Sequence, residues 1–423
     1  MFYNETIKKK TWEVWKMANV NGQRILARIH ELGKVGIGAD GRRTRLAASD
    51  TNKQGRDLVV SWMKEAGLKV VVDYIGNIFG IWETPENKDE KPFMVGSHID
   101  TVINAGQYDG CMGVISGIEL ILTMKENHIT TKRPIVVGVF TNEEGVRYAP
   151  DMMGSLVYAG GYPLEKALAS VGTDGTILGE ELKRIGYAGT VEPGFIQPSA
   201  FLEYHIEQGP IMDAEGYDIG AVDNLQGIHW YKVKIEGNAN HAGTTPIKMR
   251  HDAGLAAAKA NVFCRELAEK AGGLATMGTI SFKPDAVNVI PSEADFTMDL
   301  RNPNKEKLDY MEAEFIKYIE SLEQTDGVKV SHQRMTDFDP VPFDEDICKL
   351  TEKAAAARGL KCRRMVSGAG QDAQMLARIC PTAMIFAPSV NGISHNPKEF
   401  TKDEAVVSGA NVFLDVVLEM ANK

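Results

Sequence analysis

The stretch that decides the fold is FMVGSHIDTVINAGQYDG, residues 93–110. It begins with an apolar run typical of a buried strand and continues into a segment with several glycines, one histidine and two aspartates. Residues 112–126 then show the apolar spacing of a helix. The stretch predicts a strand, a polar loop and a helix, with His98, Asp100 and Asp109 in or beside the loop. Packing alone does not require these three side chains.

Predicted strands and helices also alternate on both sides of this stretch. Helices are predicted over 22–34 and 56–67, strands over 68–83 around a Gly-Asn turn, and an apolar strand at the start of IVVGVFTNEEG, residues 135–145. This alternation predicts an α/β domain with a mixed, mostly parallel sheet flanked by helices. Functional groups in such sheets collect beyond the carboxyl ends of the strands. His98 and the pair Glu143–Glu144 fall at such ends.

Residues 217–334 follow another pattern, in which polar-alternating strands and helices succeed one another as strand, helix, strand, strand and helix. The order indicates a smaller antiparallel α+β domain inserted into the main one. The main layer resumes with a helix over 344–359 and the apolar segment TAMIFAP. The predicted domains are therefore 1–216 with 335–423, and 217–334.

Composition excludes several classes of protein. The chain has 423 residues, a net charge of −10 and no gathered basic stripe, which argues against a nucleic-acid partner. The run Lys8–Lys10 is interpreted as a solvated helix face. No apolar run reaches the roughly 18–20 residues of a membrane span, and the first residues lack a secretory signal pattern. The five cysteines show no CxxC spacing and indicate reduced thiols, so we expect a cytoplasmic protein.

Imidazoles and carboxylates are concentrated at predicted strand ends and in glycine-flanked loops. Such groups bind divalent metals, and a pair of metals is commonly bridged by a carboxylate and a water. Each of these residues alone could equally be a cap, a turn or a surface residue. We interpret the other histidines, His30, His128, His229, His251 and His332, in that ordinary way. The candidates are His98, Asp100, Asp109, Glu143, Glu144, His205 and His395.

Several segments, spread in order over about residues 96–400, resemble one family. They are GSHIDTVINAGQYDGCMGV, FTNEEGVRYAPDMMGS, EYHIEQGP, NANHAGTTP, AVNVIPSEADFTMDLR and SGAGQDAQ…GISHNPKE. Together they resemble the amidase/carbamoylase branch of the M20 metallopeptidases, which includes N-carbamoyl-L-amino-acid hydrolases, β-ureidopropionases and allantoate amidohydrolases. The resemblance implies a zinc-peptidase-like catalytic domain and makes the inserted domain a lid that also dimerises.

The resemblance implies a site for two divalent metal ions, which could be Zn, Mn, Co or Ni. His98 and His205 would bind one ion, Glu144 and His395 the other, and Asp109 would bridge the two.

It also implies residues that act beside the ligands. Asp100 would fix the tautomer of a ligand imidazole. Glu143 would be the general base that takes a proton from the bridging water, which attacks a ureido or amide carbonyl, and then passes the proton to the leaving nitrogen.

The substrate contacts that the resemblance implies come partly from the lid. His241 would donate to the carbonyl oxygen, usually from the partner subunit, so a homodimer is expected. Asn288 and Arg301 would hold a substrate carboxylate, and Gln208 would contact the ureido group. Gln371 stands where many relatives have histidine (SGAGHDA). Glutamine can form hydrogen bonds there but carries no charge, so this departure bears on the substrate rather than on the metal site.

The implied activity is metal-dependent cleavage of the ureido C–N bond of N-carbamoyl-L-amino acids, or of N-carbamoyl-β-alanine, to the amino acid, CO2 and ammonia. Allantoate amidohydrolase is the alternative, followed by an M20 dipeptidase or aminoacylase and by a non-catalytic metal-binding homologue. The segments HIEQGP and NHAGTTP favour ureido substrates over peptides, because peptidase members usually carry an acid at the position of His205.

Overall fold

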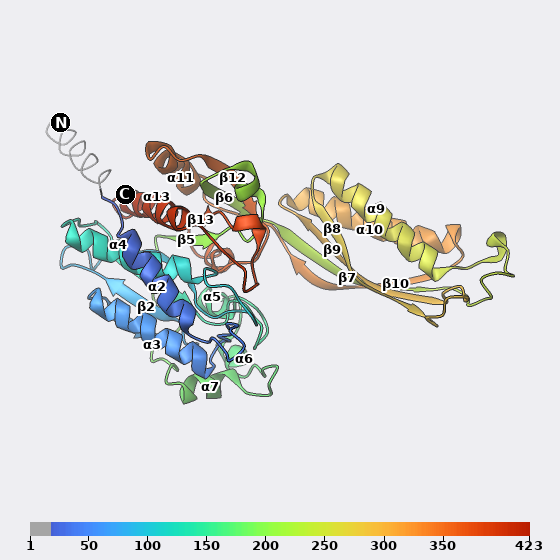
Figure 1. The fold of residues 1–423 in the computed structure, drawn as a ribbon, viewed down its shortest axis with the longest axis horizontal. Coiled ribbons are helices and arrows are strands. Elements are labelled where there is room, and N and C mark those ends of the chain that lie inside the picture. Colours follow the sequence, from blue (N-terminus) through green and yellow to red (C-terminus); the bar gives the residue numbers. More distant parts are fainter. Residues whose placement is uncertain (1–17) are drawn as a thin grey trace. The chain divides into compact units, whose positions relative to one another are not determined.

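The computed structural model describes residues 18–423 (Figure 1), so the run Lys8–Lys10 lies outside the described residues. The chain divides into two compact units. One runs up to Asp223 and resumes over Phe343–Lys423, and the other is Asn224–Pro342. Within the described range, no helix combines the length and apolar character that crossing a membrane requires.

The first unit, which we call the catalytic unit, is built on a mixed nine-stranded sheet. Its central strands, in the order β4-β3-β5-β13, are parallel, and the strands on either side pair antiparallel. This confirms the predicted fold class, with parallel pairing confined to the centre. The strands are β1 (Lys69–Val72), β2 (Ile78–Trp82), β3 (Phe93–His98), β4 (Ile135–Phe140), β5 (Ala200–Ile206), β6 (Ile219–Leu225), β11 (Val341–Pro342), β12 (Cys362–Ser367) and β13 (Thr382–Ala387).

Helices flank this sheet because every residue of β3, β4, β5 and β13 is buried and most of these residues are apolar. Helix α4 packs on β3 and β5, α13 packs on β13, and α5 and α12 pack together on the same central strands. The helices are α2 (Gly22–Lys34), α3 (Asp50–Glu65), α4 (Cys111–Glu126), α5 (Met153–Tyr158), α6 (Leu164–Leu168), α7 (Leu178–Arg184), α8 (Ile211–Glu215), α11 (Glu345–Ala357), α12 (Asp372–Leu376) and α13 (Asp403–Met420).

The second unit, which we call the lid, is a four-stranded antiparallel sheet in the order β10-β7-β9-β8, and Figure 1 shows helices α9 and α10 beside it. Buried and partly exposed residues alternate along β9, as expected for a sheet with one covered face. Phe296 and Phe315 lie in the core between sheet and helices. The elements are β7 (Gly227–Glu236), α9 (Ala253–Ala271), β8 (Leu274–Lys283), β9 (Glu293–Asn302), α10 (Lys305–Thr325) and β10 (Lys329–Phe338).

The unit boundaries differ from the predicted ones at 216/217 and 334/335. Strand β6 lies after the first predicted boundary, but it pairs with β13, so most of it belongs to the catalytic unit. Strand β10 continues past residue 334 and pairs with β7 as far as Phe338, so its end belongs to the lid. Interstrand hydrogen bonds, which composition does not reveal, therefore set both boundaries.

We predict that Gly96→Ala destabilises the catalytic unit by about 3 kcal/mol, because an added methyl group has no space and the backbone conformation excludes it. Gly96 lies opposite Gly138 in the β3–β4 pair, and a Cβ atom on Gly96 would lie 2.1 Å from the carbonyl oxygen of Gly138, at a φ of +153°. Urea unfolding measures the loss. Gly160→Ala is the control, since Gly160 has a φ of +72° and a Cβ atom added there would meet no other group within 4 Å. It should cost about 1 kcal/mol, and equal losses for the two variants would contradict the argument.

Candidate metal centre

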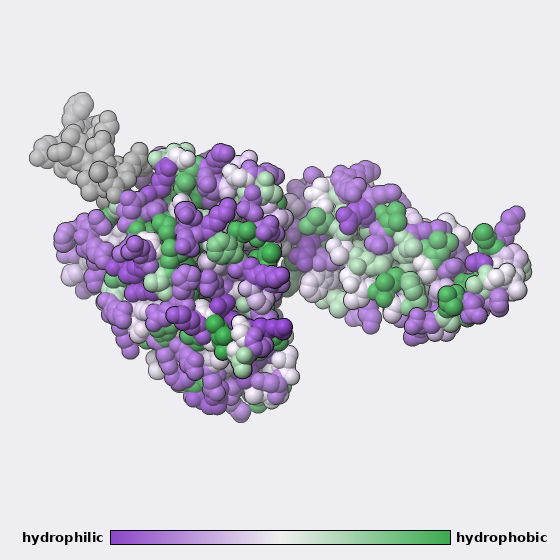
Figure 2. Space-filling model, viewed as in Figure 1, coloured by the Kyte–Doolittle hydropathy of each residue, from purple (hydrophilic) through white to green (hydrophobic). Residues whose placement is uncertain are grey.

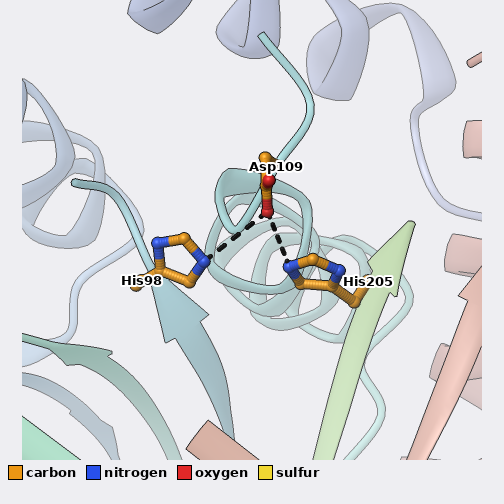
Figure 3. A group of neighbouring side chains, drawn as sticks. All are labelled: His98, Asp109 and His205. Atoms are coloured by element: carbon orange, nitrogen blue, oxygen red, sulfur yellow. Dashed lines mark ion pairs between the residues drawn. The ribbon is translucent and has the colours of Figure 1, made fainter. Parts of the chain in front are cut away.

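The first candidate ligand group joins three elements of the catalytic unit (Figure 3). His98 ends β3, His205 lies near the end of β5, and Asp109 precedes α4. The Oδ1 atom of Asp109 lies 3.7 Å from Nε2 of His98 and 3.1 Å from Nε2 of His205. All three side chains are buried. Parallel neighbours β3 and β5 end at the same edge of the sheet, which explains why the two rings face one carboxylate.

A second group uses the other oxygen of the same carboxylate. The Oδ2 atom of Asp109 lies 3.2 Å from Nε2 of His395, and that nitrogen lies 3.4 Å from Oε2 of Glu144. Donor atoms of Asp109, Glu144 and His395 all lie within 4.8 Å of one another. Asp109 thus belongs to both groups, with one oxygen turned to each. The structure brings together all five predicted ligands.

The backbone orients both buried imidazoles. Nδ1 of His98 lies 3.1 Å from the carbonyl oxygen of Asp100, and Nδ1 of His205 lies 2.9 Å from that of Ile206. An N–H at each Nδ1 donates to these oxygens and leaves Nε2 as an acceptor, which in His205 receives the backbone N–H of Gly110 at 3.1 Å. Gly110 makes this possible beside His98, because a Cβ atom on Gly110 would lie 2.4 Å from Nε2 of that ring.

The carboxylate of Asp100 holds the turn that carries the two glutamates. It lies 3.9 Å from Nδ1 of His98, and its oxygens accept the backbone N–H groups of Glu143 at 3.4 Å and Glu144 at 3.3 Å. The contact of His98 with residue 100 is therefore made by the backbone, while the side chain of Asp100 fixes where Glu143 and Glu144 begin.

The turn after β4 directs its two acids differently. Oε2 of Glu143 lies 3.5 Å from Nε2 of His98, whereas Oε2 of Glu144 faces His395 and its Oε1 accepts the N–H of Val102 at 3.2 Å. The turn requires left-handed backbone at Asn142, with a φ of 57°, and at Gly145, with a φ of 66°. Glu143 thus lies beside His98, and Glu144 lies beside His395.

Burial and mutual repulsion dominate the electrostatics of the acids. Burial, reinforced by the charge of Glu144, raises the pKa of Glu143 well above its usual range. Burial together with Asp109 does the same for the pKa of Glu144. Burial also opposes the charge of Asp109, but hydrogen bonds with His205 and His395 hold the pKa of Asp109 well below its ordinary value.

The pKa values of the histidines depend on burial and on their contacts with Asp109. Burial lowers the pKa of His98. Burial also acts against protonation of His205, but its contact with Asp109 prevails and raises the pKa of His205 to about 9. The hydrogen bond with Asp109 raises the pKa of His395. The centre thus holds carboxylates whose repulsion a bound cation relieves.

The donor set fits divalent cations. Nitrogen and oxygen donors about 2.0–2.2 Å from an ion lie roughly 3.0–3.5 Å from one another. The separations of 3.1 Å for His205–Asp109, 3.2 Å for His395–Asp109 and 3.4 Å for His395–Glu144 fall in this range. The mixture of imidazole and carboxylate suits Zn, Mn, Co or Ni.

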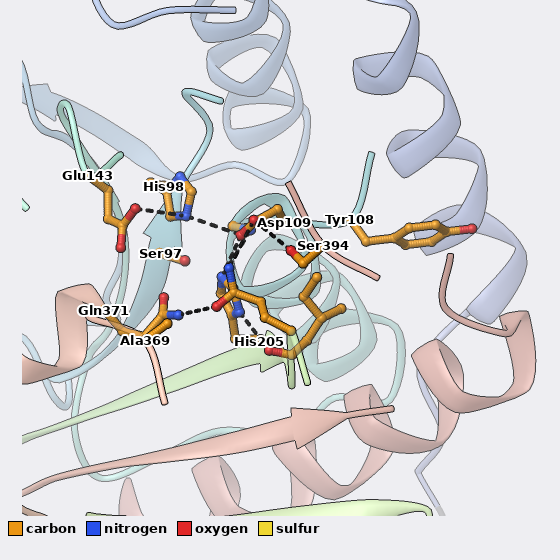
Figure 4. Close-up of polar contacts among 12 residues, drawn as sticks. Ser97, His98, Tyr108, Asp109, Glu143, His205, Ala369, Gln371 and Ser394 are labelled. Atoms are coloured by element: carbon orange, nitrogen blue, oxygen red, sulfur yellow. Dashed lines mark hydrogen bonds and ion pairs between the residues drawn. The ribbon is translucent and has the colours of Figure 1, made fainter. Parts of the chain in front are cut away.

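A chain of two amides leads away from the shared carboxylate (Figure 4). Nε2 of Gln208 donates to Oδ2 of Asp109 at 3.1 Å, and Nε2 of Gln371 donates to Oε1 of Gln208 at 2.8 Å. Because a carboxylate only accepts, it orients both amides. Oε1 of the buried Gln371 has no hydrogen-bond partner among the described residues.

The three lid candidates lie at two places within that unit. His241 forms an isolated bridge with Val289, and the N–H of Ala242 donates to the carbonyl oxygen of Asn288 at 2.9 Å, so His241 and Asn288 lie in adjoining loops. Arg301 lies near the other end of β9, opposite Ile228, and its guanidinium donates to the carboxylate of Asp299. At about 3.3 Å per residue, β9 puts roughly 26 Å between Glu293 and Arg301.

Sequence reasoning missed two buried carboxylates that support the ligands. Glu399 accepts the backbone N–H of Asp109 at 3.2 Å, and burial together with the charge of Asp109 raises its pKa to about 7. Glu203 accepts the hydroxyl of Ser97 at 2.6 Å. Both stand within a few residues of a ligand histidine, Glu399 after His395 in SHNPKE and Glu203 before His205. This closeness in sequence to the candidate ligand histidines is the signal that could have identified Glu399 and Glu203.

Comparison with known proteins agrees with this geometry. The family model for peptidase family M20/M25/M40 matches residues 94–419. The chain belongs to this family. It is 41% identical to an N-carbamoyl-L-amino-acid amidohydrolase of Rhizobium meliloti, over 95% of this chain and 97% of that protein. It is 32% identical to an allantoate amidohydrolase of Bacillus subtilis (strain 168), over 93% of this chain and 96% of that protein.

Solved structures give the same result. A crystal structure of an amidase of the hydantoinase/carbamoylase family from Burkholderia multivorans is similar with a TM-score of 0.93 and 39% identity, covering 96% of this chain and 99% of that one. The predicted family and fold are confirmed.

We predict that protein stripped of metal by a chelator loses stability as the pH rises. The folded pKa values of Glu143 and Glu144 lie above the value of 4.5 expected when unfolded, so the folded state binds more protons and deprotonation destabilises it. His205 acts in the same direction, because its stabilising proton is lost as the pH rises through about 9. His98 acts in the opposite direction, because burial lowers its pKa, but it is one group against three. Urea unfolding from pH 5 to 8 measures the slope. Metal-loaded protein should show a flatter profile, and parallel profiles would contradict the prediction.

Proposed function

We propose that the protein hydrolyses the ureido C–N bond of N-carbamoyl-L-amino acids, with N-carbamoyl-β-alanine as a related substrate. The observation that carries the proposal is the shared carboxylate of Asp109, which turns one oxygen to each of two ligand groups with Glu143 beside them. The relatives in R. meliloti and Burkholderia support this substrate class.

Two divalent ions would be held at the groups His98–Asp109–His205 and Asp109–Glu144–His395, where they would supply Lewis-acid activation of the carbonyl and acidify a water. Glu143 is the proposed general base. Its raised proton affinity suits a group that accepts a proton from water at Oε and later delivers it to nitrogen. The carboxylate of Asp100 keeps Glu143 in place by accepting the backbone N–H of Glu143.

The proposed reaction consumes one water. The water oxygen bonds to the ureido carbon, its proton passes to Glu143, and the C–N bond breaks with its electron pair going to nitrogen. Nitrogen takes the proton from Glu143 and leaves as ammonia. The remaining carbamate loses CO2 and yields the free amino acid, so all atoms are accounted for.

Gln208 and Gln371 are the proposed contacts to the ureido group. The oxygen of Gln371 is buried without a partner in the described structure, which favours an N–H donor as its natural complement. A ureido group offers such donors, whereas an acyl group offers a methyl or a methylene in the corresponding position. This supports a ureido substrate over an N-acyl or peptide substrate.

The lid supports a homodimer in which each site uses two subunits. His241 and Asn288 lie far along the sheet from Arg301, so one lid cannot bring all three to one small substrate. Strand β8 is an edge of the lid sheet and exposes Ile280 and Phe282. Helix α9 beside it exposes Leu255 and Val262, and apolar residues are visible on this unit in Figure 2. Such an edge favours pairing with a second lid.

Allantoate amidohydrolase activity is the second candidate. The relative in B. subtilis favours it, and allantoate carries both ureido groups and a carboxylate. The side chains proposed to contact the ureido group and the carboxylate would bind either substrate.

We predict that Glu143→Gln lowers kcat by about a thousandfold and keeps the metal content, because the amide cannot accept the proton. Ammonia release by metal-loaded protein is measured on N-carbamoyl-L- and D-amino acids, N-carbamoyl-β-alanine, allantoate and dipeptides. Turnover of allantoate alone would favour the second candidate, and turnover of dipeptides alone would contradict the proposal. A Glu143→Gln variant with normal kcat would contradict the role of Glu143.

We predict that two inactive variants restore activity when mixed. Arg301 lies at the end of the lid where the chain enters from the catalytic unit, so we assign it to its own subunit's site and His241 to the partner's. Arg301→Ala and His241→Ala, unfolded together and refolded as a mixture, should recover about a quarter of wild-type activity, because half of the dimers are mixed and each of those has one intact site. Each variant refolded alone is the control. No recovery in the mixture would contradict the shared site.

A further inference from the structure

We propose that Glu399 is a positioning residue that sets the spacing between Asp109 and His395 and thereby determines the affinity of the second metal ion. The inference rests on the proposed two-ion site. It concerns a side chain that lies behind the ligands and is not itself a member of either ligand group.

One carboxylate holds two segments that are far apart in the sequence. Oε1 of Glu399 accepts the backbone N–H of Tyr108 at 2.9 Å and that of Asp109 at 3.2 Å. Oε2 accepts the hydroxyl of Ser394, the residue before His395, at 3.0 Å. The Ser394 hydroxyl also lies 3.3 Å from Oδ2 of Asp109, and Figure 4 marks this contact with a dashed line. The loop of Asp109 and the loop of His395 are thus fastened through one buried group.

The chain makes room for this carboxylate. A Cβ atom on Gly106 would lie 2.1 Å from Oε1 of Glu399, so any other residue at 106 would push the carboxylate out of its place. The next residue adds a second link, because the ring of Phe400 packs edge-on against that of Tyr108 with centroids 6.0 Å apart. Two contacts therefore hold the segment of Glu399 and Phe400 against the segment of Gly106 and Tyr108.

The chemistry of the contacts selects an acid. All three partners donate, and they approach both oxygens, so a carboxylate, which accepts at both ends, satisfies all of them at once. Glutamine would keep the acceptor for the two backbone N–H groups but would turn an NH2 group toward Ser394. Alanine would release both segments.

Loss of Glu399 should affect the two ligand groups unequally. His98 and His205 are held by strand pairing, opposite Phe140 and Phe386 respectively, and by backbone carbonyls, none of which involves Glu399. His395 lies in a loop, is half exposed and has a φ of 52°, so its position depends on the contacts of its own segment. Loss of Glu399 should thus weaken the group Asp109–Glu144–His395 more than the group His98–Asp109–His205.

The test is titration of chelator-stripped, full-length protein with Mn²⁺, read by calorimetry and by the electron paramagnetic resonance signal of a coupled Mn pair. Glu399→Gln and Glu399→Ala are compared with wild type. Glu119→Gln is the matched control, since Glu119 is an equally buried carboxylate that binds Arg24 and touches no ligand. Circular dichroism verifies that each variant is folded.

We expect wild type and Glu119→Gln to bind two Mn²⁺ ions with a coupled signal. Glu399→Ala should retain the first ion, bind the second at least tenfold more weakly and lose the coupled signal, with a smaller effect for Glu399→Gln. Unchanged binding of both ions in Glu399→Ala would overturn the inference, and so would equal weakening of both. Wild type that binds fewer than two ions would instead overturn the two-ion site of the proposed function.

Discussion

The structure depends on the carboxylate of Asp109. One oxygen faces His98 and His205, the other faces His395, and no other residue belongs to both of these ligand groups. Burying this acid close to Glu143 and Glu144 is costly without a cation, because ionised groups lose several kcal/mol of hydration when they enter a protein interior. The fold therefore gathers several buried acids whose charged forms a bound cation would stabilise.

The two halves of the centre are held by different means. His98 and His205 end strands whose register is fixed by the hydrogen bonds of a buried sheet. Glu144 and His395 come from turns. Left-handed backbone at Asn142, Gln208 and His395 costs of the order of 1–3 kcal/mol at each residue and persists only where side-chain contacts enforce it. The amide of Asn142, for example, donates to the carbonyl oxygens of Tyr148 and Pro150. The positions of Glu144 and His395 therefore depend more on individual side-chain contacts than the positions of His98 and His205 do.

Much of this could be predicted from the sequence, for a physical reason. Apolar periodicity defines β3, α4 and β4, and polar residues that interrupt it at strand ends have no role in packing, which identified His98 and the pair Glu143–Glu144. Partners far along the chain could not be derived in that way. The contact between Asp109 and Glu399 and the end of β10 beyond residue 334 depend on which segments meet, and periodicity carries no information on that. The five ligands were predicted together only because several segments resembled one family.

The lid residues Asn288 and Arg301 show the same limit. Similar motifs implied that Asn288 and Arg301 hold one carboxylate, and nothing in their spacing opposes this. The structure adds that β9 begins at Glu293, five residues after Asn288, and pairs with β7 along its whole length, so the strand keeps roughly 26 Å of backbone between Glu293 and Arg301. A rigid sheet therefore turns two contacts that the sequence places close together into opposite ends of one lid. If both residues bind the same small substrate, two copies of the lid must supply them, and dimerisation becomes a requirement of substrate recognition.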